Sequence, residues 1–179
     1  QYAKHQVMSF QFDDLQTIEH TKCKPLSVTL AVETNTRKIL GFEVSSMPAT
    51  GHLAKISREK YGYRKDDRRK GIKKLFEKIS PYIDQKASIS SDQHPYYKPK
   101  VDKYFPDAIY NQVKGARGCI AGQGELKKQV YDPIFSLNHT CAMLRYKINR
   151  LVRKTWCTTK VPERLRDHLN LYVSYHNML

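Results

Sequence analysis

The chain has few acidic residues and lacks the long apolar runs of membrane proteins. Its 179 residues include 17 Asp and Glu against 32 Lys and Arg, which gives a formal net charge of +15. No apolar run reaches membrane-spanning length and no signal peptide opens the chain. The charge favours a polyanionic partner, either nucleic acid or an anionic membrane surface.

Several motifs of metal and nucleophile chemistry are also missing. The four cysteines are scattered without a C-x-x-C pair, which is typical of a reduced cytosolic protein. A zinc site mixing His20, Cys23, His139 and Cys141 is an alternative, although its spacings match no standard finger. The sequence contains no G-x-S-x-G and no H-E-x-x-H, and the glycines between 115 and 124 lack P-loop spacing. No side-chain nucleophile is therefore evident.

Alternating and helical periods along the chain predict an α/β fold. We predict strands over 6–12, 25–33, 38–45, 87–91 and 107–113, helical periodicity over 51–61, 66–79, 134–155 and 161–179, and a short helix or loop over 95–105. Asp66 and Asp67 are expected in a first helical turn. The order βββ-α-β-α-β-α-α predicts one domain over 1–179, with a mixed five-stranded sheet flanked by helices and the fourth strand beside the first. Residues 114–133 are expected to form a Gly-rich loop.

Aspartates follow two of these predicted strands. The first strand stops at Asp13 and Asp14, and the fourth stops at Asp92. If the two strands are parallel neighbours, Asp13 and Asp92 project from the same edge of the sheet, where ligands of open α/β sheets collect. Paired carboxylates suit Mg²⁺ or Mn²⁺, which can activate an attacking oxygen and stabilise a leaving one. Asp14 is the alternative to Asp13, but its side chain should face the opposite side of the strand.

A third ligand is expected from the helix packed against that edge. Asn138 and Arg145 are seven residues apart and share a helix face over two turns. Asn138 offers a neutral oxygen, and Arg145 could hold a phosphate. The alternative is that Asn138 caps the helix or faces solvent and that Arg145 is a surface charge.

These stretches together resemble a known family. Phe12-Asp13-Asp14, Ser91-Asp92 and the segment from Leu137 to Lys160 are similar to the catalytic core of bacterial insertion-sequence transposases, and most similar to the insertion-sequence-one type and its relatives. The resemblance covers nearly the whole chain. It implies a ribonuclease-H-like, integrase-like fold and a D-D-E type triad with a basic residue seven positions after the third member.

The resemblance also implies site residues, cofactors and partners. Asp13 and Asp92 match the first two triad positions and Arg145 the basic one, but Asn138 stands where most such families have glutamate. Glu125, with Asp132 behind it, is the acidic substitute. The implied activity is metal-dependent phosphodiester hydrolysis and 3′-hydroxyl strand transfer with two Mg²⁺ or Mn²⁺ ions.

The implied partner is DNA, with no membrane, and the implied state is a homo-oligomer on DNA at the nucleoid of a bacterial cytoplasm. Gln1 is not a natural start, so we expect a preceding DNA-binding region to be missing. An inactive, transposase-derived DNA-binding protein and a nuclease on the same fold are the alternatives.

Basic residues continue beyond the predicted triad. From Arg145 to Lys160 there are six basic residues and no acid. Candidate phosphate contacts are Arg145, Lys147, Arg150, Arg153 and Lys154, and a solvated helix face is the alternative for each. Tyr96 and Tyr97 could stack on an exposed base or pack the loop. Trp156 is predicted to belong to the core, and His94 and His139 to have structural or phosphate-contacting roles.

Overall fold

A single five-stranded sheet organises the protein. The structure, a computed structural model, describes residues 6–114, 131–151 and 156–178. The strands are β1 (Val7–Glu19), β2 (Thr21–Glu33), β3 (Ile39–Ser46), β4 (Ile83–Asp92) and β5 (Ile109–Val113). Their order in the sheet is β3-β2-β1-β4-β5, with β1, β2 and β3 antiparallel and with β4 and β5 parallel to β1. The mixed α/β sheet and the pairing of the first and fourth strands are therefore confirmed.

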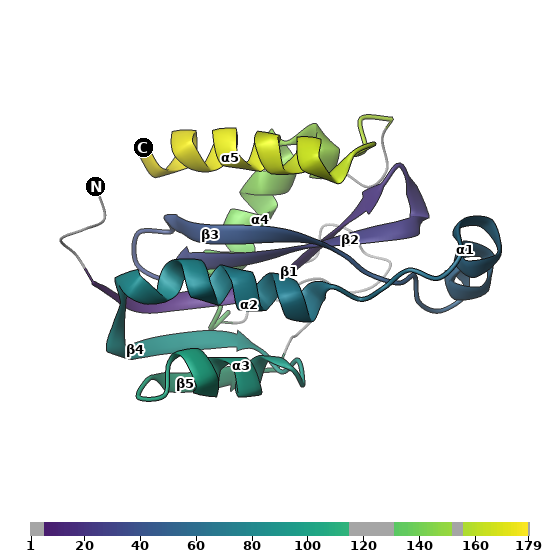
Figure 1. The fold of residues 1–179 in the computed structure, drawn as a ribbon. Coiled ribbons are helices and arrows are strands. Elements are labelled where there is room, and N and C mark those ends of the chain that lie inside the picture. Colours follow the sequence, from purple (N-terminus) through teal and green to yellow (C-terminus); the bar gives the residue numbers. More distant parts are fainter. Residues whose placement is uncertain (1–5, 115–130, 152–155, 179) are drawn as a thin grey trace.

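Helices cover both faces of this sheet. They are α1 (Leu53–Tyr61), α2 (Arg68–Ile79), α3 (Tyr97–Tyr104), α4 (Phe135–Lys147) and α5 (Pro162–Met178), with short 3₁₀ turns η1 (Ser80–Tyr82) and η2 (Asn149–Leu151). One apolar cluster joins the sheet to α2 and α3, and a second joins its other face to α4, η2 and α5. Figure 1 shows α1 standing beyond one end of the sheet. None of the described helices is long and apolar enough to cross a membrane.

Strand β1 runs on past the point where the sequence predicted its end. It passes through Asp13 and Asp14 and continues pairing with β2 as far as Glu19. The predicted end of the strand is wrong because Asp14 is satisfied within the fold. Its carboxylate accepts hydrogen bonds from the hydroxyls of Thr29 (2.5 Å) and Tyr96 (2.6 Å). Two acidic residues therefore do not break the strand. What ends at Asp13 is only the parallel pairing with β4, whose last partners are Phe12 and Ser91.

Helix α4 is shorter than the predicted 134–155. Ile148 leaves the helical conformation at φ −114° and ψ 100°, and the 3₁₀ turn η2 follows. The apolar period persists across this break because Leu144, Ile148 and Leu151 all pack into the same buried cluster. Periodicity alone could not separate one long helix from a helix followed by a turn. Residues 152–155 lie outside the described ranges.

Two smaller differences concern the segment between β3 and β4. It contains the two helices α1 and α2, where the predicted order counts one. Asp67 is the residue before α2 and Asp66 precedes it, so neither lies in the first helical turn. Asp66 instead accepts hydrogen bonds from the Arg68 side chain.

Candidate functional site

The structure brings Asp13 and Asp92 together at the edge where β1 and β4 stop pairing. Phe12 and Ser91 are the last partners of the parallel ladder, and Asp13 and Asp92 are the residues that follow them. The two carboxylates are close enough to repel each other. The predicted meeting of these two residues thus occurs, with Asp92 at the end of its strand and Asp13 in the middle of its own.

Backbone donors hold one oxygen of each carboxylate. The Asp14 amide donates to Asp13 Oδ1 (2.7 Å), and the His94 amide donates to Asp92 Oδ1 (3.0 Å). The Tyr97 hydroxyl adds a second bond to Asp13 Oδ1 at 3.0 Å. These hydrogen bonds, all from described residues, go to Oδ1 of each carboxylate.

Burial and a neighbouring like charge dominate the electrostatics of Asp13. Burial, followed by repulsion from Asp92, raises the pKa of Asp13 from 3.8 to about 6, although the bonds from Asp14 and Tyr97 act in the opposite direction. Burial and the nearby aspartates also raise the pKa of Tyr97 far above its usual range. Tyr97 is therefore a permanent hydrogen-bond donor at neutral pH, and Asp13 is a carboxylate whose charge is costly.

Helix α4 lies over this pair through Cys141. Burial, with a smaller contribution from Asp13, raises the pKa of the Cys141 thiol to about 12, although Arg145 acts in the opposite direction. Cys141 therefore stays a neutral thiol and is close to both Asp13 and Arg145. The structure thus brings the predicted basic residue Arg145 to the same region as the carboxylate pair, on an exposed part of the helix.

Asn138 lies on the same face of α4 as Cys141 and Arg145, three and seven residues before them. Its side chain is exposed, and its Nδ2 donates to Asp132 Oδ2 at 2.8 Å. Asp132 also accepts from the amide of Ile134, the N-cap residue of α4, at 3.0 Å, so this carboxylate lies just before the start of the helix. The recorded side-chain contact of Asn138 is thus with Asp132, and its amide oxygen remains an acceptor.

Asp14 is adjacent to Asp13 in β1, so the alternation along a strand predicts that its side chain faces the other side. Its carboxylate accepts hydrogen bonds from Thr29 and Tyr96, whereas Asp13 accepts one from Tyr97. The Arg68 guanidinium lies over the Tyr96 ring, 5.8 Å from its centroid. This arrangement holds the start of α3 against the sheet.

Sequence reasoning missed the role of the tyrosines. Tyr97 is fully buried and packs on Phe12, so it belongs to the core and cannot stack on a base. Its hydroxyl nevertheless reaches Asp13. The signal in the sequence was the tyrosine pair directly after the Asp92 strand, which was interpreted only as stacking or loop packing. The prediction that Trp156 belongs to the core is wrong, because this side chain is 94% exposed.

Few of the described side chains are placed to bind a metal ion together. Among residues 6–114, 131–151 and 156–178, no group of three or more His, Cys, Asp or Glu could hold a metal ion. The zinc alternative built on His20, Cys23, His139 and Cys141 is therefore wrong. Two carboxylates with an amide oxygen remain as the possible set. Glu125, the acidic substitute, lies outside the described residues, as do most of the Gly-rich loop and the candidate phosphate contacts Arg153 and Lys154.

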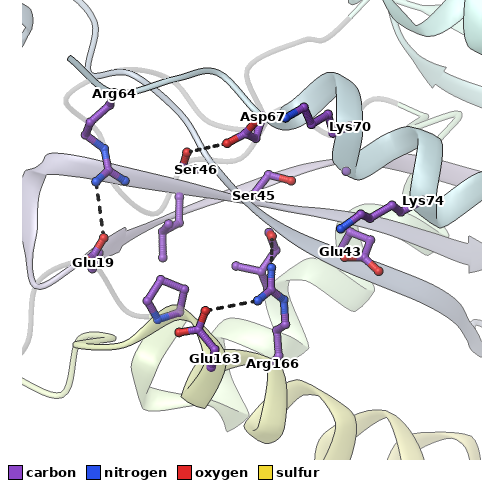
Figure 2. Close-up of a pocket in the computed structure, with 14 residues that line it drawn as sticks. Glu19, Glu43, Ser45, Ser46, Arg64, Asp67, Lys70, Lys74, Glu163 and Arg166 are labelled. Atoms are coloured by element: carbon purple, nitrogen blue, oxygen red, sulfur yellow. Dashed lines mark hydrogen bonds and ion pairs between the residues drawn. The ribbon is translucent and has the colours of Figure 1, made fainter.

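Two hollows lie away from the carboxylate pair. The first, of about 400 Å³ between β3, α2 and α5, is lined by four acidic and four basic side chains. Figure 2 shows that several of these neutralise one another, with Arg64 paired to Glu19 and Arg166 to Glu163. The second, of about 650 Å³, includes the candidate phosphate contacts Lys147 and Arg150. Only the second has the charge of an anion-binding surface.

Comparison with known proteins adds no family assignment. No protein-family model matches this chain. A search among curated proteins likewise found no match.

Proposed function

We propose that this chain is the catalytic core of a DNA transposase with a ribonuclease-H-like fold. The observation that carries the proposal is the meeting of Asp13 and Asp92 on neighbouring parallel strands, with burial and then their mutual repulsion raising the pKa of Asp13 to about 6. Such a pair is poorly satisfied by itself and well suited to a divalent cation. The strand order and the helix carrying Arg145 over the pair support the same assignment.

The residues of the site fit Mg²⁺ or Mn²⁺. Oδ2 of Asp13 and Oδ2 of Asp92 would hold the metal, with the Asn138 amide oxygen as the neutral third ligand. Hard divalent cations prefer such oxygen donors and often take few carboxylates from the protein. When bound, the metal supplies charge stabilisation for the attacking and leaving oxygens of a phosphodiester.

The protein's own groups have distinct roles in this scheme. The Asp14 amide and the Tyr97 hydroxyl fix Asp13 Oδ1, so that Oδ2 keeps one orientation. Arg145 binds a non-bridging phosphate oxygen of the DNA. Cys141 stays protonated and adds no negative charge near the pair.

The proposed reaction has two steps. Water attacks the phosphorus at the end of the element, one P–O bond forms, and the bond to the 3′ oxygen breaks, releasing a 3′-hydroxyl. That hydroxyl then attacks a target phosphodiester and displaces its 3′ oxygen. The proposed working form is a homo-oligomer that holds two DNA ends.

Strand cleavage of supercoiled plasmid DNA, with and without Mn²⁺ or Mg²⁺, tests this function. Asp13→Asn and Asp92→Asn are expected to reduce metal-dependent nicking by roughly 10²-fold or more. Asp84→Asn, near the opposite end of strand β4, is the matched control and should nick as the wild type does. Nicking that survives both site substitutions would rule out the assignment.

A DNA-binding protein without catalysis is the second candidate. It is favoured by one observation, the engagement of the Asn138 amide with Asp132. Such a protein binds DNA with steep salt dependence but shows no cleavage at any Mn²⁺ concentration. Asn138→Glu separates the two: an active enzyme keeps or gains cleavage, and a DNA-binding protein remains inactive.

A further inference from the structure

A strongly basic hollow lies where α4 ends and meets the start of α5. It has a volume of about 650 Å³, and none of the described residues that line it is acidic. Its cations are Lys147, Arg150 and Lys160, with His168 beside them. The hollow between β3, α2 and α5, by contrast, is lined by four basic and four acidic residues. The charge of this one is therefore not a general property of the molecule's hollows.

Trp156, the single tryptophan of the chain, stands at the rim of this hollow. It is 94% exposed. The residues after it are firmly anchored: Thr158 and Thr159 are buried, and the Thr159 carbonyl accepts a hydrogen bond from the His20 amide at 2.6 Å. A large aromatic ring left in water beside an ordered segment costs hydrophobic free energy. Such exposure is typical of a ring that stacks on a ligand.

The cations of the hollow are not used in ion pairs within the described part of the chain. Arg150 donates from Nε to His168 Nδ1 at 3.2 Å, and Lys160 donates to the Thr158 hydroxyl at 3.3 Å. The Arg150 backbone is fixed, since its carbonyl lies 3.4 Å from the Thr17 hydroxyl of β1. These partners orient the positive charges without neutralising them, as a phosphate-binding surface requires.

We infer that this hollow binds an unpaired nucleotide of the DNA, with its base stacked on Trp156 and its phosphates held by Lys147, Arg150 and Lys160. The inference rests on the proposed function, because it places the strand relative to the catalytic pair. Proteins that bind single-stranded nucleic acid usually combine an aromatic ring, on which a base stacks, with basic side chains that bind the phosphates. An anionic membrane surface would use the charges but gives no reason for an ordered ring above a hollow.

The separation of Cys141 and Lys147 along α4 indicates how far that nucleotide lies from the carboxylate pair. Cys141 lies beside Asp13, and Lys147 follows it by six residues, which is about 9 Å along a helix axis. One DNA strand advances about 3.4 Å per nucleotide in a duplex. The Lys147 end of the hollow is therefore expected within a few nucleotides of the phosphate at the Asp13–Asp92 pair.

The fluorescence of Trp156 reports on this site directly, because no other tryptophan contributes. The full chain carrying Asp92→Asn, which leaves the DNA uncut, is titrated with a duplex bearing a three-nucleotide single-stranded overhang and with the same duplex blunt. The overhang should quench the fluorescence and bind more tightly than the blunt end. Trp156→Ala should weaken overhang binding about 5- to 150-fold, the range that one stacked base provides, and leave blunt binding unchanged.

Charge variants complete the test. Lys147→Ala with Lys160→Ala should flatten the dependence of overhang affinity on salt by about 1.4 in log–log slope, while Lys86→Ala, an exposed lysine of β4, should not. Unchanged fluorescence with both DNAs, or equal loss of both affinities in Trp156→Ala, overturns the inference. A response to phosphatidylserine vesicles and not to DNA also overturns it, in favour of a membrane surface. Because these titrations require no cleavage, a failure here leaves the metal-dependent activity to be judged by its own assay.

Discussion

Replacing Asp13 by asparagine is expected to stabilise the metal-free protein at neutral pH. The pKa of this carboxyl rises from 3.8 to about 6 on folding, mainly through burial and secondarily through Asp92. A carboxyl with a raised pKa contributes its full stability below pH 3.8, where it is protonated in both states. That contribution is lost as the pH rises toward 6, because ionisation is cheaper in the unfolded chain. Asparagine has no charge to lose and can still accept the bonds from Asp14 and Tyr97.

The size of the effect follows from the shift of about two pKa units. Each unit corresponds to about 1.4 kcal/mol, so the full penalty at neutral pH is about 3 kcal/mol. At pH ~4.5 most of the penalty has not yet developed, and the difference should be about 1 kcal/mol. The advantage of Asp13→Asn therefore grows by about 2 kcal/mol between pH ~4.5 and pH ~7.5.

Urea denaturation of both proteins at these two pH values, in chelator, measures the difference directly. Comparing variant with wild type at each pH cancels the titration of the other groups. Mn²⁺ should then stabilise the wild type, by about 2.7 kcal/mol at one hundred times its dissociation constant, and should have little effect on Asp13→Asn. An advantage that does not change with pH would refute the claim that the Asp13 charge is held at a cost.

Four further outcomes are expected. Tyr97→Phe should weaken Mn²⁺ binding roughly 10-fold by calorimetry, since Asp13 Oδ1 loses one of its two donors, while a blunt-duplex affinity measured without metal stays unchanged. Asn138→Asp should tighten Mn²⁺ binding, because the neutral side-chain amide is replaced by a third carboxylate. Equal Mn²⁺ binding would place Asn138 away from the metal. Gly71→Ala should cost about 1–3 kcal/mol in urea denaturation, because a Cβ there would lie 2.2 Å from Ser45 Oγ, and the loss should shrink in a Ser45→Ala background. Phe76→Ala should cost about 3–5 kcal/mol, since Phe76 is fully buried against Phe12 and Phe105.

The sequence predicted the sheet because its strands carry strong local signals. The alternation before Asp13 and the hairpin between residues 25 and 45 were enough to give the strands, although β1 continues to Glu19 and β2 begins at Thr21. The parallel pairing of the first and fourth strands followed from fold rules and from the two aspartates. The structure bears out that pairing.

The errors arose where contacts distant in sequence decide the outcome. The strand continues through Asp14 because Thr29 and Tyr96, 15 and 82 residues away, satisfy its carboxylate. Ile148 ends α4 although the apolar period continues into Leu151. Trp156 was assigned to the core from its residue type alone, and only the fold reveals its exposure. The Tyr97 hydroxyl could not be connected with Asp13 before α3 was placed against the sheet.

Calorimetric titration of Mn²⁺ into wild type, Asp13→Asn, Asp92→Asn and Asp84→Asn tests the central claim most directly. The claim is that Asp13 and Asp92 jointly hold a divalent cation. Binding is predicted in the wild type and in Asp84→Asn, and loss of binding is predicted in both Asp13→Asn and Asp92→Asn. Equal Mn²⁺ binding by all four proteins, or no binding by any of them, would contradict it.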